Sequence, residues 1–172
     1  MGNLPKKSIY ELLALHVDTM KELRNRGVLR SGNIPTGDFA EHLFCEAFDW
    51  CQERNSKKAY DAINPEGIRF QIKARRLHSR NRSRQLSSIR SIKGFDFLAA
   101  VLFDEYYRVT RAAIIPSRVV SELATDDRHV NGKRFLLVDA VWNKSEVEDV
   151  TETLREAAYN LGYDPASDLE QV

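Results

Sequence analysis

The stretch "AYDAINPEGIRFQIKAR" (residues 59–75) consists of two strand-like runs joined by the turn NPEG (residues 64–67). Asn at the first turn position, Pro at the second and Gly at the fourth favour a type I turn. A glycine in the left-handed conformation directly after such a turn produces a three-residue hairpin loop with a bulge. In this loop Asn64 pairs with Ile68, so the turn fixes the register of the whole hairpin.

This register and the two-residue period of a strand divide the hairpin into two faces. Asp61 lies opposite Gln71, and Lys73 follows on the same face, together with Arg69 and Arg75. The opposite face is apolar and consists of Tyr60, Ala62, Ile68, Phe70, Ile72 and Ala74. An apolar face packs on a core, which independently supports the register. The polar face gathers a carboxylate, a carboxamide and an ammonium group.

The remaining predicted elements surround this hairpin. Helices are predicted at residues 8–26, 38–53, 116–123 and 145–161, and strands at 58–63, 68–75, 95–103, 107–115 and 133–141. Ser8 with Glu11, and Ser145 with Glu148, have the spacing of a capping box at the start of the first and last helices. Residues 76–93 are rich in Arg and Ser and predict a loop, with room for a short helix at 85–92. This order predicts an α+β fold, in which helices flank a central mixed sheet.

The length of 172 residues suits a single domain with a sizeable core. We expect an N-terminal helix and loop at 1–35, a core at 36–140, a C-terminal helix at 141–163 and a flexible tail at 164–172. The apolar fraction of 42% and the charged fraction of 30% are typical of a soluble globular protein. No apolar run approaches the roughly 20 residues of a membrane span, and the N-terminus lacks a signal-peptide core, so a cytoplasmic protein is expected.

The net charge of +1 conceals a strongly basic segment. Residues 67–95 contain no Asp or Glu but hold nine of the 26 Lys and Arg residues, which leaves 17 basic against 25 acidic residues elsewhere. Seven of the nine are Arg, which is well suited to bidentate contacts with phosphate. Charge segregated in this way predicts a polyanionic partner. The candidates to bind nucleic-acid phosphates are Arg75, Arg76, Arg80, Arg82 and Arg84.

The polar face of the hairpin carries the groups that phosphodiester hydrolysis requires. Asp61 and Gln71 offer a carboxylate and a neutral oxygen, which suit Mg²⁺, a metal that is bound through one or two carboxylates and keeps several waters. The metal would polarise the phosphate and activate a water, and Lys73 would orient that water or stabilise the developing negative charge. Glu41, on the flank of the second helix's apolar stripe, is a further candidate. Because Asp38 and Glu41 also have capping-box spacing, Glu41 is alternatively a cap of its own helix.

The motif "YDAI…FQIKAR" resembles the core of the PD-(D/E)xK nucleases, the restriction-endonuclease-like superfamily. Asp61, a turn, and then Gln71-x-Lys73 on the second strand match the spacing of that family, and Glu41 matches the glutamate that its first core helix often supplies. The resemblance covers about residues 36–140 and extends to a bacterial branch that shares "YDAI…QIKAR" followed by a Ser/Arg segment. It implies a restriction-endonuclease-like core with an added N-terminal helix.

The same resemblance implies a metal-dependent DNA endonuclease of restriction or defence type, with Mg²⁺ or Mn²⁺ held by Asp61, Gln71 and Glu41. Two positions depart from the family pattern: Tyr60 stands where the family has proline, and Gln71 replaces the usual Asp or Glu. The glutamine removes one negative charge from the metal site and should weaken Mg²⁺ binding. Concerted cutting of both DNA strands would require two sites and hence a homodimer.

Two other interpretations stay open from the sequence. In the first, the chain is a catalytically silent module of the same fold that binds nucleic acid through the basic segment, an alternative that Gln71 favours. In the second, the basic segment docks an acidic protein. Steeply salt-dependent DNA binding would argue against this second alternative.

Overall fold

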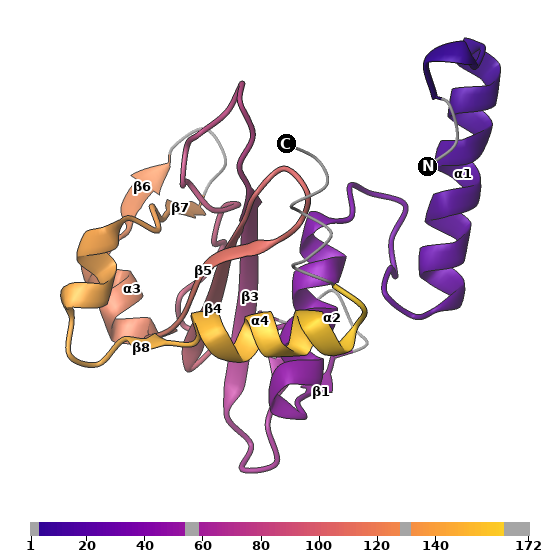
Figure 1. Ribbon diagram of the computed structural model, residues 1–172. Helices are drawn as coiled ribbons and strands as arrows, with labels where there is room; N and C mark the ends of the chain where they lie inside the picture. Colours follow the sequence, from indigo (N-terminus) through magenta and orange to yellow (C-terminus); the bar gives the residue numbers. More distant parts are fainter. Residues whose placement is uncertain (1–3, 54–58, 128–131, 164–172) are drawn as a thin grey trace.

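A six-stranded sheet forms the centre of the computed structural model, which describes residues 4–53, 59–127 and 132–163 (Figure 1). Its strands lie in the order β1-β2-β3-β4-β5-β8. They are Cys51–Gln52 (β1), Ala62–Ile63 (β2), Arg69–Arg76 (β3), Phe97–Phe103 (β4), Val109–Pro116 (β5) and Glu148–Asp149 (β8). β3 and β4 are parallel, whereas the other neighbouring pairs are antiparallel. The sheet is therefore mixed, and the predicted α+β class is confirmed.

Two helices cover one face of this sheet, α2 (Thr36–Phe48) and α4 (Thr151–Asn160). Phe44 of α2 and Leu154 of α4 are completely buried there against sheet residues such as Ile72 and Val101. The apolar period of α2 brings Ala40, Leu43 and Phe44 to the sheet. α2 is thereby held directly over β3, the strand that carries the Gln71-x-Lys73 motif.

The opposite face is also buried. It is covered by α3 (Ser117–Leu123), by the 3-10 helix η2 (Asp139–Asn143) and by loop residues that include Leu86 and Phe135. β4 is apolar along its whole length because successive residues enter opposite cores, as expected for a central strand. A separate two-stranded sheet, formed by β6 (Thr125–Asp127) and β7 (Gly132–Arg134), lies outside the main sheet.

The hairpin forms in the register that its turn predicts. Gly67 has a φ of +83°, its N–H donates to the carbonyl of Asn64, and the N–H of Asn64 donates to the carbonyl of Ile68. Ala62 then pairs with Phe70, as a three-residue loop requires. The prediction was wrong for Tyr60, which packs with the core on the other side of the sheet from Ala62 and Phe70. β2 begins only at Ala62, so strict alternation does not extend back to that residue.

Two predicted elements near the C-terminus were wrong. Residues 133–141 do not form a strand of the main sheet, because β7 ends at Arg134 and η2 begins at Asp139. Phe135 and Leu137 between them are fully buried, which explains the strand-like alternation of the sequence. The last helix begins at Thr151 rather than at Ser145, since Glu148 and Asp149 pair with β5 as the edge strand β8. The predicted tail at 164–172 lies outside the described residues.

The segment between β3 and β4 is more ordered than the predicted loop. It extends beyond the end of β3 as a narrow arm, here called the basic arm (residues 77–93), at the top of Figure 1. His78 and Asn81 bridge each other near its tip, and Ile89 bridges Lys133 on β7. Leu86 and Ile89 are buried, so apolar anchors fix the base of the arm. The short helix predicted at 85–92 is absent from this described segment.

The N-terminal helix α1 (Ile9–Asn25) is confirmed, including its capping box. The N–H of Ser8 donates to Oε2 of Glu11 over 2.7 Å, and the N–H of Glu11 donates to Oγ of Ser8. α1 stands apart from the sheet and its covering helices (Figure 1). Among the described helices, none combines the length and the apolar character that crossing a membrane demands.

Candidate functional site

The turn and the pairing of β2 with β3 bring the three hairpin candidates together. Nε2 of Gln71 donates a hydrogen bond of 2.6 Å to Oδ2 of Asp61, and Nζ of Lys73 lies 3.9 Å from the same oxygen. The backbone N–H of Ile72 also donates to it, over 2.7 Å. Asp61, Gln71 and Lys73 therefore converge on one side of the hairpin, as the register requires.

Glu41 joins this group from helix α2. Its Oε2 accepts a hydrogen bond of 2.8 Å from Nε2 of Gln52 and lies 3.6 Å from Nη1 of Arg30. The capping alternative for Glu41 is wrong, because α2 begins without a side-chain cap and Asp38 instead accepts from the backbone N–H groups of Arg30 and Ser31. The side chain of Glu41 is thus directed away from its own helix end and toward the site.

Helix α2 ends earlier than predicted, and this shorter helix explains the position of Gln52. Asp49 adopts the left-handed conformation with a φ of 53°, so the chain turns after Phe48 and forms β1. Gln52 then pairs with Ala62 next to Asp61. The end of α2 and the start of the sheet thereby place the amide of Gln52 against the carboxylate of Glu41.

The electrostatics of Glu41 differ from those of an ordinary surface carboxylate. Burial raises the pKa of Glu41, and the negative charge of Asp61 raises it further. The hydrogen bond from Gln52 and the charge of Arg30 act in the opposite direction but do not cancel the increase. Two carboxylates therefore lie close enough to repel each other, which is an arrangement that a cation would relieve.

The donor set fits a hard divalent cation. Glu41 and Asp61 offer carboxylate oxygens, and Oε1 of Gln71 remains an acceptor because its Nε2 is used by Asp61. Mg²⁺ prefers oxygen ligands and few protein carboxylates, which matches this set. Among the described residues, no three His, Cys, Asp or Glu side chains cluster as a metal site. Any metal here would consequently depend on Gln71 or on water to complete its ligands.

A cleft of about 420 Å³ adjoins these residues. Glu41 and Lys73 line it, whereas Asp61 and the largely buried Gln71 are not part of its wall. The other lining residues come from the start of α2, the end of β3 and the basic arm, and include Thr36, Gly37, Arg75, Arg76, His78 and Asn81. The cleft is thus acidic at Glu41 and basic along the continuation of β3.

The predicted phosphate-binding arginines do not all share this cleft. Arg75 and Arg76 line it, with Arg75 donating to the carbonyl of Ser83 and Arg76 stacked over the ring of Tyr107. Arg80 and Arg82 are exposed on the basic arm. Arg84 forms an ion pair of 2.7 Å with Asp139, so part of its charge is neutralised within the protein.

Arg69 shares the basic segment but has a structural role. Its guanidinium makes a bidentate contact with Asp96, at 2.9 and 3.0 Å, and its backbone N–H donates to the same carboxylate. These hydrogen bonds hold the pKa of Asp96 below its usual value. The pair fixes the start of β3 to the start of β4, so the parallel strand that carries Gln71 and Lys73 has a defined position.

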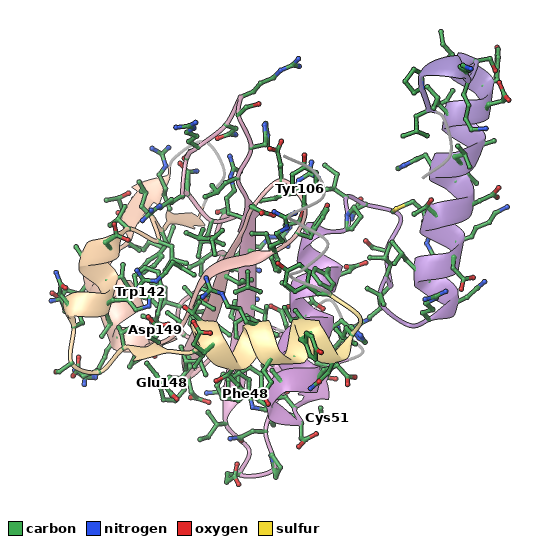
Figure 2. All side chains as sticks on the ribbon, viewed as in Figure 1. Phe48, Cys51, Tyr106, Trp142, Glu148 and Asp149 are labelled. Atoms are coloured by element: carbon green, nitrogen blue, oxygen red, sulfur yellow. The ribbon has the colours of Figure 1, made fainter. Side chains whose placement is uncertain are left out.

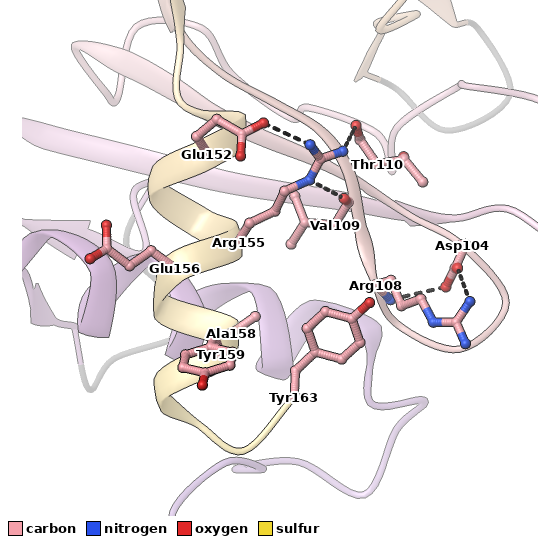
Figure 3. A pocket seen from close by; sticks show the side chains of 10 residues that line it. All are labelled: Asp104, Arg108, Val109, Thr110, Glu152, Arg155, Glu156, Ala158, Tyr159 and Tyr163. Atoms are coloured by element: carbon pink, nitrogen blue, oxygen red, sulfur yellow. Dashed lines mark hydrogen bonds and ion pairs between the residues drawn. The ribbon is translucent and has the colours of Figure 1, made fainter. Parts of the chain in front are cut away.

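A larger cavity, of about 710 Å³, lies between α4 and β5 (Figure 3). Arg155 crosses its wall and donates to the carbonyls of Val109 and Thr110 and to Glu152. Arg108 and Asp104 pair with each other at the adjoining turn. Arg155 therefore joins α4 to β5, and the Arg108–Asp104 pair supports the β4–β5 turn.

Sequence reasoning missed Gln52 and Arg30. Gln52 fell within the predicted second helix, and Arg30 within a loop rich in turn residues, so neither had a pattern of its own. Nη2 of Arg30 donates to the carbonyl of Glu53, which ties this loop to the strand that carries Gln52. If the end of the helix at Asp49 had been recognised, Gln52 could have been predicted to lie in a strand. The approach of Gln52 to Glu41 is a tertiary contact that the sequence does not indicate.

No protein-family model matches the chain, and a search of curated proteins finds no match. Solved structures that resemble it include one of a bacterial homing endonuclease. That structure, of I-Ssp6803I, has a TM-score of 0.40 and 17% sequence identity, and the match covers 76% of this chain and 93% of that one.

Proposed function

We propose that this protein is a metal-dependent hydrolase of nucleic-acid phosphodiesters, a DNA endonuclease of the PD-(D/E)xK type. The observation that carries the proposal is the convergence of Glu41 from α2 with Asp61, Gln71 and Lys73 from the hairpin, beside a cleft that continues into a basic arm. The motif resemblance extends the proposal to an enzyme of restriction or defence type.

Each residue has a distinct role in this proposal. Glu41, Asp61 and Gln71 hold Mg²⁺ or Mn²⁺, which when bound would polarise the scissile phosphate and acidify a water. Lys73, whose ammonium lies 3.9 Å from Asp61, orients the attacking water or stabilises the charge that develops on phosphate oxygens. Asp61 is itself oriented by the N–H of Ile72 and by Gln71, so its position does not depend on the metal.

The basic residues supply binding along the nucleic-acid backbone. Arg75 and Arg76 lie in the cleft next to Lys73, and Arg80 and Arg82 lie exposed further along the arm. Arginines at these positions suit successive phosphates, because each guanidinium offers several donors. This geometry favours a backbone-tracking mode of binding that positions one phosphodiester over Lys73.

The function is tested by incubating plasmid, linear duplex and single-stranded DNA with the protein in Mg²⁺ or Mn²⁺. We expect cleavage by the wild type, and a loss of roughly 10²–10³-fold or more in Asp61→Asn and Lys73→Met, as for removal of a transition-state contact. Lys93→Met is the matched control, since Lys93 is an exposed lysine of the same basic segment that does not line the cleft. Equal activity in Lys73→Met and Lys93→Met would show that the assigned site is wrong.

The test also separates the proposal from a silent binding module, which the missing carboxylate at Gln71 favours. Salt-dependent DNA binding without cleavage on any substrate would identify the silent module. The variant Gln71→Glu tests whether the glutamine is the cause of inactivity, because it places a carboxylate on β3 beside that of Asp61. If DNA is neither bound nor cut, the basic arm serves an acidic protein instead.

A further inference from the structure

Helix α1 stands apart from the rest of the domain (Figures 1 and 2). Its N-terminal half carries large apolar side chains that are exposed. Its exposed fractions are 76% for Ile9, 85% for Tyr10, 40% for Leu12, 56% for Leu13 and 48% for Val17. Of all the residues of α1, only Met20 is buried. These five side chains, here called the α1 face, are large apolar groups exposed together on one short stretch of helix.

The α1 face is a continuous surface. At about 100° per residue, its five members lie within a sector of roughly 160°, which also contains the exposed His16 and the buried Met20. The acidic residues of the helix, Glu11, Asp18 and Glu22, lie on the opposite side. An isolated helix of this length is only marginally stable in water, and helices gain most of their stability by burying such a face. We therefore expect the α1 face to pack against a partner surface.

The charge pattern narrows the kind of partner. Residues 9–17 contain neither Lys nor Arg, so the α1 face itself lacks the cations that attract nucleic acid or an anionic membrane, and Lys6 and Lys7 precede the helix. The basic residues of the chain are concentrated instead in residues 67–95. The partner that best fits the α1 face is therefore an apolar protein surface.

We propose that the partner is a second copy of this chain, whose α1 face packs against the first about a two-fold axis. An apolar face is self-complementary, which is what a two-fold interface between identical subunits requires. At the usual scale of apolar side-chain burial, the five side chains together expose on the order of 500 Å² per copy. The pair would bury on the order of 1,000 Å² in total, which reaches the lower limit of specific interfaces and indicates a dimer of moderate affinity.

The anchoring of α1 is compatible with this pairing. The C-terminal end of the helix is tied to the loop that follows it by a hydrogen bond from Nε of Arg24 to the carbonyl of Ser31, and Met20 and Leu29 are buried there. Only the N-terminal half is used for pairing. The loop that follows α1 brings Arg30 to within 3.6 Å of Glu41, which lines the cleft. The cleft residues therefore lie outside the proposed interface.

The oligomeric state of the full chain tests the proposal without any substrate. We expect sedimentation to show a monomer–dimer equilibrium with a dissociation constant on the order of micromolar. Leu13→Glu should weaken dimerisation by at least about 10-fold, because it places a charge in the apolar contact. Leu15→Glu is the matched control: Leu15 is 41% exposed on the same helix but lies outside the α1 face, and its replacement should leave the dimer intact.

A second measurement keeps the proposal testable if Leu13→Glu fails to fold. Leu13→Cys in a Cys51→Ser background should form an intermolecular disulfide under mild oxidation, whereas Leu15→Cys should not. Cys45 does not interfere, since burial raises the pKa of its thiol to about 12 and keeps it protonated. A wild type that remains monomeric at all concentrations, or equal effects of the changes at Leu13 and Leu15, would overturn the proposal.

Discussion

Two hollows of the domain, the larger cavity beside α4 and the cleft beside β3, differ in what their charged side chains do. In the larger cavity, beside α4, Arg155 is satisfied by two backbone carbonyls and by Glu152. In the smaller cleft, beside β3, Glu41 has a raised pKa because burial and Asp61 both oppose its ionisation. Volume alone would favour the first hollow as a binding site, whereas incompletely compensated charge favours the second.

The comparison indicates which charges are structural and which are available for chemistry. Around the larger cavity, Arg155 pairs with Glu152 within α4 and also connects α4 with β5 by donating to two backbone carbonyls. Around the cleft, two carboxylates lie together and Lys73 approaches only one of them. Charged side chains that destabilise the fold, and that come together from separate segments of the chain, are typical of a functional site.

The largest effect is expected from Glu41→Gln compared with Glu156→Gln, its counterpart in the larger cavity. Loss of the Glu41 carboxylate should lower the rate of DNA cleavage by roughly 10²–10³-fold, because a metal ligand is removed while the shape is kept. The change at Glu156 should leave the rate within about two-fold, because no role in metal binding is assigned to it. Rates measured at saturating DNA and Mg²⁺ check this, and similar losses in both variants would remove the distinction between the hollows.

A smaller effect is expected from Gln52→Leu, which removes the hydrogen bond of 2.8 Å to Glu41. Cleavage should fall about 10-fold and require more Mg²⁺, since a positioning contact to a metal ligand typically contributes this much. Mn²⁺ binding measured by calorimetry should weaken in parallel, which a purely structural role would not produce. An unchanged metal affinity would show that Gln52 does not position Glu41.

Arg155→Met should lower the stability of the fold but leave DNA cleavage nearly unchanged. It removes contacts to Val109, Thr110 and Glu152, and we expect a decrease of about 1 kcal/mol in the free energy of unfolding because the side chain is partly exposed. Cleavage per folded molecule should stay within about two-fold of the wild type. Chemical denaturation together with activity assays checks both parts, and a selective loss of activity would assign chemistry to the larger cavity.

The smallest effect concerns the pH dependence of stability. The pKa of Glu41 is higher in the folded than in the unfolded protein. Its contribution to the free energy of unfolding is therefore fully present below the pKa of the unfolded state and is lost as pH rises through the pKa of the folded state. In metal-free buffer, Glu41→Gln should therefore unfold at a higher temperature than the wild type at pH 8, and the difference should disappear near pH 4. Thermal unfolding at both pH values checks this. A variant that is equally destabilised at both would contradict the assigned cause.

The hairpin shows how much of the site a sequence can predict. The residues of the turn dictate a local conformation, and the local conformation dictates which side chains share a face, so the approach of Asp61 to Gln71 was predictable. Glu41 was predictable only as a candidate, because its capping-box spacing offered an equally local alternative. The contacts of Gln52 and Arg30 were not predictable, since they depend on where α2 ends and on how its following loop returns to the sheet.

The errors near the C-terminus have a related cause. Phe135 and Leu137 alternate as in a strand because both enter the core, but burial alone does not decide whether a segment joins a sheet. The edge beside β5 is occupied by β8, whose residue Glu148 had been predicted, with Ser145, to form the capping box of the last helix. Which segment pairs with the edge of the sheet is decided by competition among all the segments that could reach it.

The sequence by itself determined the turn, the register of the hairpin, the α+β class and the segregation of basic charge, because these depend on residues close together in the chain. Tertiary structure alone decided that Glu41 reaches the hairpin, that Gln52 and Arg30 support it, and that α1 leaves an apolar face exposed. These features depend on packing between distant segments, whose relative positions are set by the burial of the whole core and not by any local preference.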